Sequence, residues 1–201
     1  MMKSRSFAFA SLALLLGLTV GCSIAVNKDK NGEDKNVKID TPFGGVHVNS
    51  DGTTAADVGL PVYPGAQLSP KKDGGDKAAD VRLGFGDWQF RLKVVKYHSS
   101  DSSDQILAFY RKALGRYGDV IQCSGQNPVG SPTMTHEGLT CSDSEHGHEV
   151  KVDVSPQSLK AGSKRHQHIV GIDKTDNQGT TFSLVELELP AGTEGDNRET
   201  N

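Results

Sequence analysis

The sequence lacks the surplus of positive charge that nucleic-acid-binding proteins carry. Its 201 residues include 22 basic and 25 acidic side chains. Residues 1–21 hold the basic residues Lys3 and Arg5 and no acidic residue, so their removal leaves 20 basic and 25 acidic residues, a net charge of −5. A mildly acidic chain of this kind suits solubility and offers no basic face to a nucleic acid.

The apolar run near the N-terminus, Phe7 to Val20, is shorter than the ~20 residues that a permanent transmembrane helix needs. Lys3 and Arg5 precede the run, which is the layout of a secretory signal peptide. The sequence therefore predicts a signal peptide at residues 1–21.

The end of this run, Leu18-Thr19-Val20-Gly21-Cys22, resembles the lipobox of bacterial lipoproteins. Small Gly21 fits the family pattern, whereas Thr19 replaces the leucine that the family prefers. The resemblance implies cleavage before Cys22, a diacylglyceryl thioether on its sulfur, and usually an acyl chain such as palmitate on its new amino group. Two or more acyl chains anchor a protein stably in a membrane.

This resemblance also implies a location. The protein would belong to the cell envelope, held by lipid alone. Ser23 follows the cysteine where Asp would favour inner-membrane retention in a Gram-negative cell, so the expected place is the outer membrane, facing the periplasm. The alternative is an ordinary signal peptide that is cleaved nearby, with Cys22 lost.

Cysteine is scarce, since Cys123 and Cys141 are the only ones besides Cys22. An even pair in an oxidising compartment predicts a disulfide. The competing interpretation is a metal or redox pair, but the spacing is nothing like CxxC.

No complete catalytic or cofactor motif is present. Two His-Glu pairs, at 136–137 and 148–149, each begin the zinc-protease motif HExxH, but the fifth positions hold Thr140 and Val152. The GxSxG, Walker and SxxK patterns are absent as well. We therefore expect a non-enzymatic protein without a cofactor, while a hydrolase whose triad forms only in the folded chain stays open as an alternative.

Two HxH pairs are the candidate metal ligands: His146 with His148, and His166 with His168. In a strand, residues i and i+2 point to the same side, so each pair can present two imidazoles to a zinc or copper ion. Metal binding or sensing is therefore an alternative function. The accessory ligands would be Glu137, Glu145 and Glu149.

The predicted domain organisation follows from composition. Residues 22–36 are expected to be the lipidated N-terminus and a flexible tether, because residues 27–38 are charged and carry no aromatic side chain. Residues 37–190 are expected to form a single domain, and the acidic, polar stretch 191–201 predicts a disordered tail.

Periodicity within the domain predicts an α+β fold. Trp88, Phe90, Leu92 and Val94 alternate with polar residues, which indicates a strand. Apolar residues at three- and four-residue intervals between 106 and 117 predict an amphipathic helix that packs on the sheet containing Trp88 and Phe90. Short strands are expected at 119–124, 138–142, 148–154, 166–172 and 181–189. The expected class is one main helix packed on a mostly antiparallel sheet.

Two short segments carry a second resemblance. Tyr63-Pro64-Gly65-Ala66 and the later Phe109-Tyr110 resemble uncharacterised bacterial envelope proteins in which a YPGA segment precedes strands and a helix carrying FY. The resemblance spans residues 59–120 and implies a fold without any catalytic residue. Together with the anchor, it favours a binding or structural protein of the envelope, whose partners are the membrane, through its lipid, and an envelope protein or cell-wall component.

Overall fold

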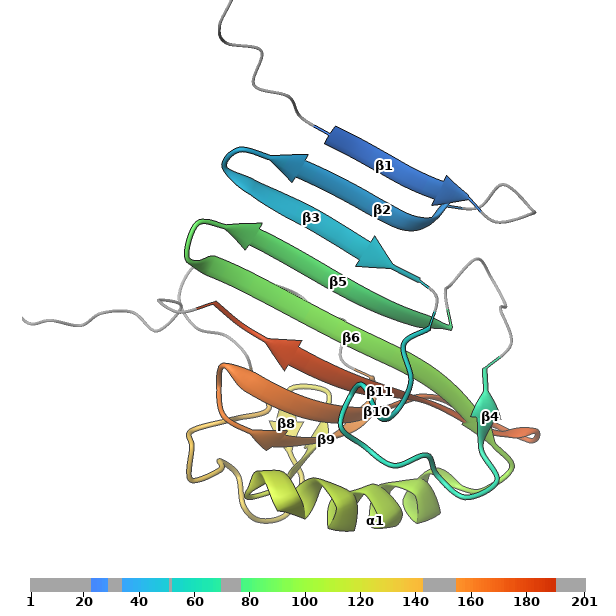
Figure 1. The fold of residues 1–201 in the computed structure, drawn as a ribbon. Helices are drawn as coiled ribbons and strands as arrows, with labels where there is room; N and C mark the ends of the chain where they lie inside the picture. Colours follow the sequence, from blue (N-terminus) through green and yellow to red (C-terminus); the bar gives the residue numbers. More distant parts are fainter. Residues whose placement is uncertain (1–22, 29–33, 51, 70–76, 143–154, 191–201) are drawn as a thin grey trace, which may run out of the picture.

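A computed structural model describes residues 23–28, 34–50, 52–69, 77–142 and 155–190. Its main feature is an 11-stranded sheet in the order β1-β2-β3-β5-β6-β11-β10-β9-β7-β8, with β4 paired to β6 outside this path (Figure 1). Every pairing is antiparallel. The strands are β1 (Ser23–Lys28), β2 (Asp34–Thr41), β3 (Gly44–Asn49), β4 (Gln67–Leu68), β5 (Ala78–Phe85), β6 (Trp88–Ser99), β7 (Ile121–Ser124), β8 (Asn127–Pro128), β9 (Gln157–Gly162), β10 (His166–Asp176) and β11 (Gly179–Glu188).

The predicted α+β class is wrong, because strands dominate the described chain and its single α-helix, α1 (Ser103–Leu114), has 12 residues. The sequence analysis missed β9, the two-residue strands β4 and β8, and also β1, which lies within the predicted tether and pairs with β2. Short strands of this kind are held by ladder hydrogen bonds of the backbone, which side-chain periodicity does not reveal.

Several expected strands are present and one is not. β7, β10 and β11 confirm the predicted strands at 119–124, 166–172 and 181–189. Residues 138–142 form no strand, and the predicted strand at 148–154 lies outside the described residues, as do the predicted signal peptide and tail.

The predicted helix is confirmed, and local chemistry explains where α1 begins. Ser102 is its N-cap: the backbone amide of Gln105 donates to Ser102 Oγ at 3.4 Å, and the Ser102 amide donates to Gln105 Oε1 at 3.2 Å. This reciprocal capping box satisfies amides that have no partner within the helix. Ile106, Tyr110 and Leu114 form its buried stripe, and a 3₁₀ turn (Gly115–Tyr117) follows.

The sheet has two unlike faces. We call the face against which α1 packs the helix face; Val95, Leu184, Val170 and Leu159 lie side by side on it, across β6, β11, β10 and β9. All four side chains are buried in the main core, together with those of α1. Burial of this kind is the main source of stability for such a domain.

The opposite face, which we call the far face, carries the residues that the sequence analysis expected beneath the helix. Because side chains alternate along β6, Val95 and Tyr97 point to the helix face and Phe90, Leu92 and Val94 to the far face. The helix therefore packs on the expected sheet but on its other side. The sequence pattern shows that one face is apolar, without showing which face the helix covers.

The YPGA and FY segments lie in contact. The rings of Tyr63 and Phe109 are edge to face with centroids 5.1 Å apart. Tyr63 Oη donates to Asp101 Oδ2 at 2.6 Å, and Tyr110 Oη donates to the Pro61 carbonyl at 3.0 Å. The 60–66 segment, which turns at Pro64 and Gly65, thus packs against α1 and closes the main core.

Candidate functional site

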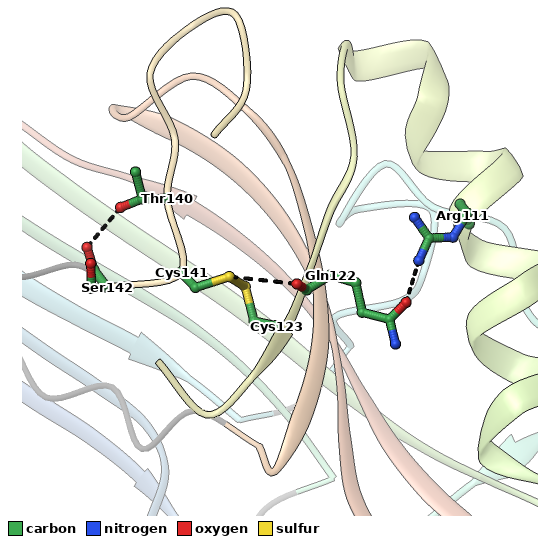
Figure 2. Close-up of a disulfide and its surroundings, with 6 residues drawn as sticks. All are labelled: Arg111, Gln122, Cys123, Thr140, Cys141 and Ser142. Atoms are coloured by element: carbon green, nitrogen blue, oxygen red, sulfur yellow. Dashed lines mark hydrogen bonds between the residues drawn. A yellow bond between two sulfur atoms is a disulfide. The ribbon is translucent and has the colours of Figure 1, made fainter. Parts of the chain in front are cut away.

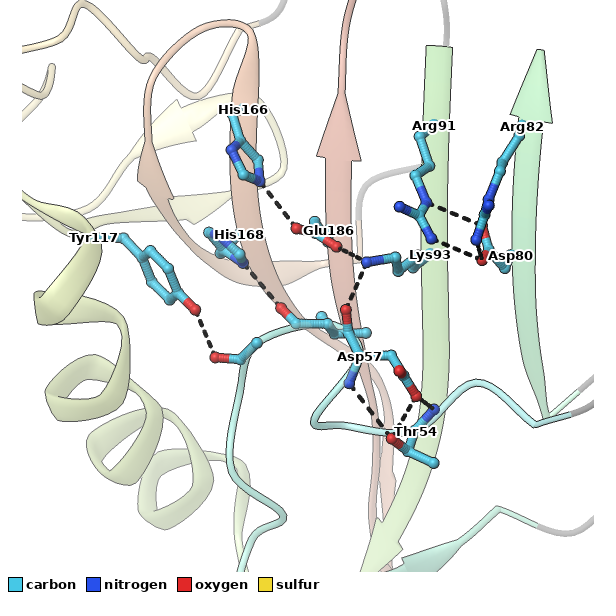
Figure 3. Close-up of polar contacts among 12 residues, drawn as sticks. Thr54, Asp57, Asp80, Arg82, Arg91, Lys93, Tyr117, His166, His168 and Glu186 are labelled. Carbon is cyan, nitrogen blue, oxygen red and sulfur yellow. Dashed lines mark hydrogen bonds and ion pairs between the residues drawn. The ribbon is translucent and has the colours of Figure 1, made fainter. Parts of the chain in front are cut away.

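A polar cluster occupies the helix face at the centre of the sheet, with His166 and His168 on β10, Glu186 on β11 and Lys93 on β6 (Figure 3). Register brings them together: Lys93 is directly opposite Glu186, and Glu186 directly opposite His168. His166 lies two residues before His168 and therefore on the same side. The predicted His166 and His168 pair is thus placed beside a carboxylate.

Lys93 and Glu186 form a buried ion pair. Lys93 Nζ donates to Glu186 Oε2 at 2.5 Å and to the Asp57 carbonyl at 2.7 Å. Burial raises the pKa of Glu186, but hydrogen bonds from Lys93 and His166 outweigh this effect and hold the pKa below its usual value. Glu186 is therefore a carboxylate at neutral pH.

His168 is held on both sides of its ring. Its Nδ1 lies 3.0 Å from the Val58 carbonyl, and its ring stacks on Tyr117 with centroids 3.6 Å apart. Tyr117 is fixed in turn, since its hydroxyl donates to the Gly59 carbonyl at 2.6 Å. Burial lowers the pKa of His168, and the neighbouring His166 adds to the shift, so the ring is neutral at pH 7.

His166 is the solvent-facing member of the cluster, with 51% of its side chain exposed. Its Nε2 lies 3.0 Å from Glu186 Oε1. One donor atom from each of His166, His168 and Glu186 lies within 4.8 Å of the others. With Nδ1 of His168 donating to Val58, its Nε2 keeps the lone pair that a metal ion needs, and a backbone carbonyl orienting a ligand histidine is common in metal sites.

A second polar group lies nearby on the same face. Arg82 and Arg91 both donate to the Asp80 carboxylate, at 2.7 and 3.0 Å to Oδ2. Burial raises the pKa of Asp80, but the hydrogen bonds from the two arginines lower it to about 2. A shallow hollow beside this group is lined by Asp40, His47, Arg82, Gln89, Arg91 and Glu188.

The other predicted ligands are not brought to this cluster. Glu137 lies beside Gly118, where its carboxylate is 3.4 Å from an idealised Cβ, and His146, His148, Glu145 and Glu149 lie outside the described residues. Sequence reasoning missed Glu186 and Lys93. The signal available for Glu186 is its place among alternating apolar residues in the stretch Val185 to Leu189.

The predicted disulfide is confirmed: Cys123 and Cys141 are bonded, with Cα atoms 5.6 Å apart (Figure 2). Both side chains are buried with Ile121 and Leu139 in a small second core. Cys141 lies in a bend, not in the strand that the sequence predicted. The bond ties the 131–142 segment to β7, whose Gln122 side chain accepts a hydrogen bond from Arg111 of α1.

The far face is the other candidate functional surface. Six aliphatic side chains form one row across β1, β2, β3, β5, β6 and β11: Val26, Val37, Val48, Val81, Leu92 and Leu187. A parallel row crosses five strands: Ile24, Ile39, Val46, Leu83 and Phe90. No described helix packs on this face; α1 lies on the helix face, where it contacts β9 and β10 and its Tyr110 ring lies 5.7 Å from the Phe182 ring of β11. Most of these side chains are half-buried, Leu187 is buried, and Ile24 and Val26 are exposed. Contiguous exposed apolar surface marks protein or membrane contacts.

The described residues contain no helix that combines the length and the apolar character needed to cross a bilayer. Cys22 lies outside those residues, so its lipidation stays a prediction. No histidine ring in the described part of the chain is hydrogen-bonded to a serine hydroxyl, and a Ser-His-Asp triad is not assembled there.

Neither protein-family models, nor curated proteins, nor solved structures give a match to the chain. Nothing in these comparisons points to an enzyme.

Proposed function

We propose that the protein is a lipid-anchored component of a bacterial cell envelope that acts by binding and not by catalysis. The observation that carries the proposal is the position of the lipobox-like segment directly before β1. Cys22 is bonded to Ser23, and Ser23 already pairs with Asp40 of β2. An acylated Cys22 would hold the sheet at the membrane without a linker.

The far face supports the binding role. It is built from paired aliphatic side chains, and the described α1 packs against the other side of the sheet. An apolar surface of this kind favours an envelope protein or the membrane as partner over a polar cell-wall polymer, because its gain in free energy comes from removing apolar area from water.

Metabolic labelling with radioactive palmitate tests the anchor. Wild-type protein should be labelled and sediment with membranes, and Cys22→Ala should lose both properties. The matched control is the double variant Cys123→Ala, Cys141→Ala, which removes the other two cysteines and should stay labelled. Equal labelling of wild type and Cys22→Ala contradicts the proposal.

A second candidate function is metal binding, which the placement of His166, His168 and Glu186 favours. Their donor atoms lie within 4.8 Å of one another, and zinc and copper accept imidazole and carboxylate ligands. Lys93 disfavours metal binding, because its ammonium group already neutralises the negative charge of Glu186. Weakening this ion pair should therefore strengthen binding.

Calorimetry with zinc and copper tests this function. The expected dissociation constant is below ~10 μM, a free energy of about −7 kcal/mol. The double variant His166→Ala, His168→Ala should abolish binding, while Lys93→Met should tighten it. His98→Ala is the matched control, since His98 lies 3.4 Å from Thr181 Oγ1 at the other end of β6. Weaker binding by wild type removes this candidate.

A further inference from the structure

Aromatic side chains gather at one end of the sheet. Phe43 lies in the β2–β3 turn and Phe85 and Trp88 flank the β5–β6 turn, with exposed fractions of 83%, 51% and 39%. The rings of Phe85 and Trp88 have centroids 5.9 Å apart, and Trp88 stacks on Phe90. We call the group of Phe43, Phe85 and Trp88 the aromatic end.

Strand register joins the two turns into one surface. Gly44, next to Phe43, pairs with Phe85, and Phe85 pairs with Trp88. The Phe85 ring lies across Gly44, where an added Cβ would come within 2.5 Å of Phe85 Cδ1. An added Cβ would also lie 2.1 Å from the Gly84 carbonyl oxygen, so the glycine admits both the neighbouring strand and the exposed Phe85 ring.

The start of β1 lies at this same end. Ser23 pairs with Asp40, and one residue further Thr41 pairs with Gly44 at the β2–β3 turn. Figure 1 shows the beginning of β1 and both turns on the left side of the sheet. Cys22 precedes Ser23 by one peptide bond, across which consecutive Cα atoms are about 3.8 Å apart.

We propose that the aromatic end faces the bilayer and inserts into its interface, so that the sheet touches the membrane at two points; this rests on the proposed anchor at Cys22. Four strand spacings, roughly 19 Å, separate β1 from β6 along this end. A lipid at one side and aromatic rings at the other would fix the orientation of the sheet, whereas a lipid alone leaves it free to swivel.

The chemistry of this end matches the interfacial region. Tryptophan and other aromatic side chains concentrate at the level of the lipid headgroups. Asp87 in the same turn is exposed, and Arg82 and Arg91 lie on the helix face close by. These charges limit insertion to the headgroup level, because charged groups are costly in the hydrocarbon core.

Trp88 allows a direct test because it is the only tryptophan in the sequence. The lipidated, full-length mature protein is reconstituted into phosphatidylcholine vesicles whose lipids carry bromine at shallow or deep positions. Trp88 fluorescence should fall at least twofold with shallow bromine and less with deep bromine. Its emission should also shift to the blue relative to protein in detergent-free buffer.

The matched control moves the tryptophan to β4, beside the other end of β6. Leu68 is 51% exposed and pairs with Tyr97, nine residues or roughly 30 Å from Trp88 along the strand. The double variant Trp88→Phe, Leu68→Trp should show no quenching. Circular dichroism of this variant confirms that it is folded.

Palmitate labelling of the same preparations distinguishes a failure of this proposal from a failure of the proposed anchor at Cys22. If the protein is labelled but Trp88 is quenched no more than the tryptophan at position 68, this proposal is wrong. The proposed anchor at Cys22 is then retained. Protein without label overturns both. A blue shift that depends on protein concentration and not on vesicles identifies a second copy of the chain as the occupant and also overturns the proposal.

Discussion

Lys93 and Glu186 face each other across β6 and β11, with 2.5 Å between Nζ and Oε2 and only 11% of each side chain exposed. They are separated by 93 residues in the sequence. Lys93 also holds the Asp57 carbonyl, so one ammonium group links the sheet to the 52–60 loop. The pair therefore organises both the polar cluster and the loop that contacts His168.

Removing one partner of this pair should be costly. Lys93→Met leaves a buried carboxylate without its main counter-charge, and we expect the free energy of unfolding to fall by about 3 kcal/mol. The double variant Lys93→Met, Glu186→Leu should recover most of the loss. Urea denaturation measures both values. If Lys93→Met is as stable as wild type, water solvates the Glu186 carboxylate in place of Lys93, and the ion pair is not needed for stability.

Asp80 should make stability depend on acid pH. Its pKa is about 2 in the folded protein and ~3.9 in an unfolded chain, so its stabilisation is complete above pH ~4 and is lost as pH falls toward 2. Asp80→Asn should cost about 1–2 kcal/mol at pH 7, a value reduced by solvent screening at Arg82. The cost should shrink on acidification.

Denaturation of wild type and Asp80→Asn at several pH values between 7 and 2.5 checks this dependence. Asp87→Asn is the control, since Asp87 is an exposed turn residue of the same hairpin. A cost that is independent of pH would assign the effect of Asp80→Asn to packing and not to charge.

The disulfide should contribute to stability by an amount that rises with the logarithm of the length of the loop it closes. Cys123 and Cys141 are 18 residues apart, which corresponds to about 3 kcal/mol in the chain-entropy estimate. Reduction of wild type and the double variant Cys123→Ala, Cys141→Ala should both show this loss. A thiol assay on denatured, unreduced protein should detect neither cysteine. Detection of both would refute the bond.

The sequence predicted those features whose causes are local. Ser102 and Gln105 are three residues apart, and the buried positions of α1 recur within single turns, so the helix is visible in a short window. The spacing of His166 and His168 likewise places both rings on one side of β10. Cys123 and Cys141 could be paired for a different reason, since they are the two cysteines left besides Cys22 in a chain expected to reach an oxidising compartment.

Features that depend on strand register were not predictable in this way. Glu186 joins His168 and Lys93 only because β11 lies between β10 and β6, an order that no local pattern encodes. The alternation of Phe90, Leu92 and Val94 revealed an apolar face but not its side. β1 was assigned to a tether because residues 27–38 are charged and carry no aromatic side chain. In the structure its backbone pairs with β2 although its side chains are exposed, with Ile24 at 69%.

Gly59 should be needed for the stacking of Tyr117 on His168. Its φ is +74°, and an added Cβ would lie 2.4 Å from Tyr117 Oη. Gly65 has nearly the same φ, +76°, but has open space around it. Gly65→Ala therefore measures the cost of the backbone strain alone. We expect Gly65→Ala to cost about 1 kcal/mol and Gly59→Ala about 2–3 kcal/mol, because only the latter displaces a ring.

Chemical denaturation gives the two costs, and the NMR shift of the His168 Cε1 proton reports the stacking directly. The proton should move in Gly59→Ala, as Tyr117 leaves the ring, and stay in place in Gly65→Ala. Equal costs with an unmoved proton would mean that Tyr117 accommodates the methyl group, and that the stacking does not depend on Gly59. If Gly59→Ala loses more stability than Gly65→Ala and its His168 Cε1 proton shifts, the 52–60 loop helps to position the candidate metal ligands. Displacing Tyr117 would then also change the affinity for zinc.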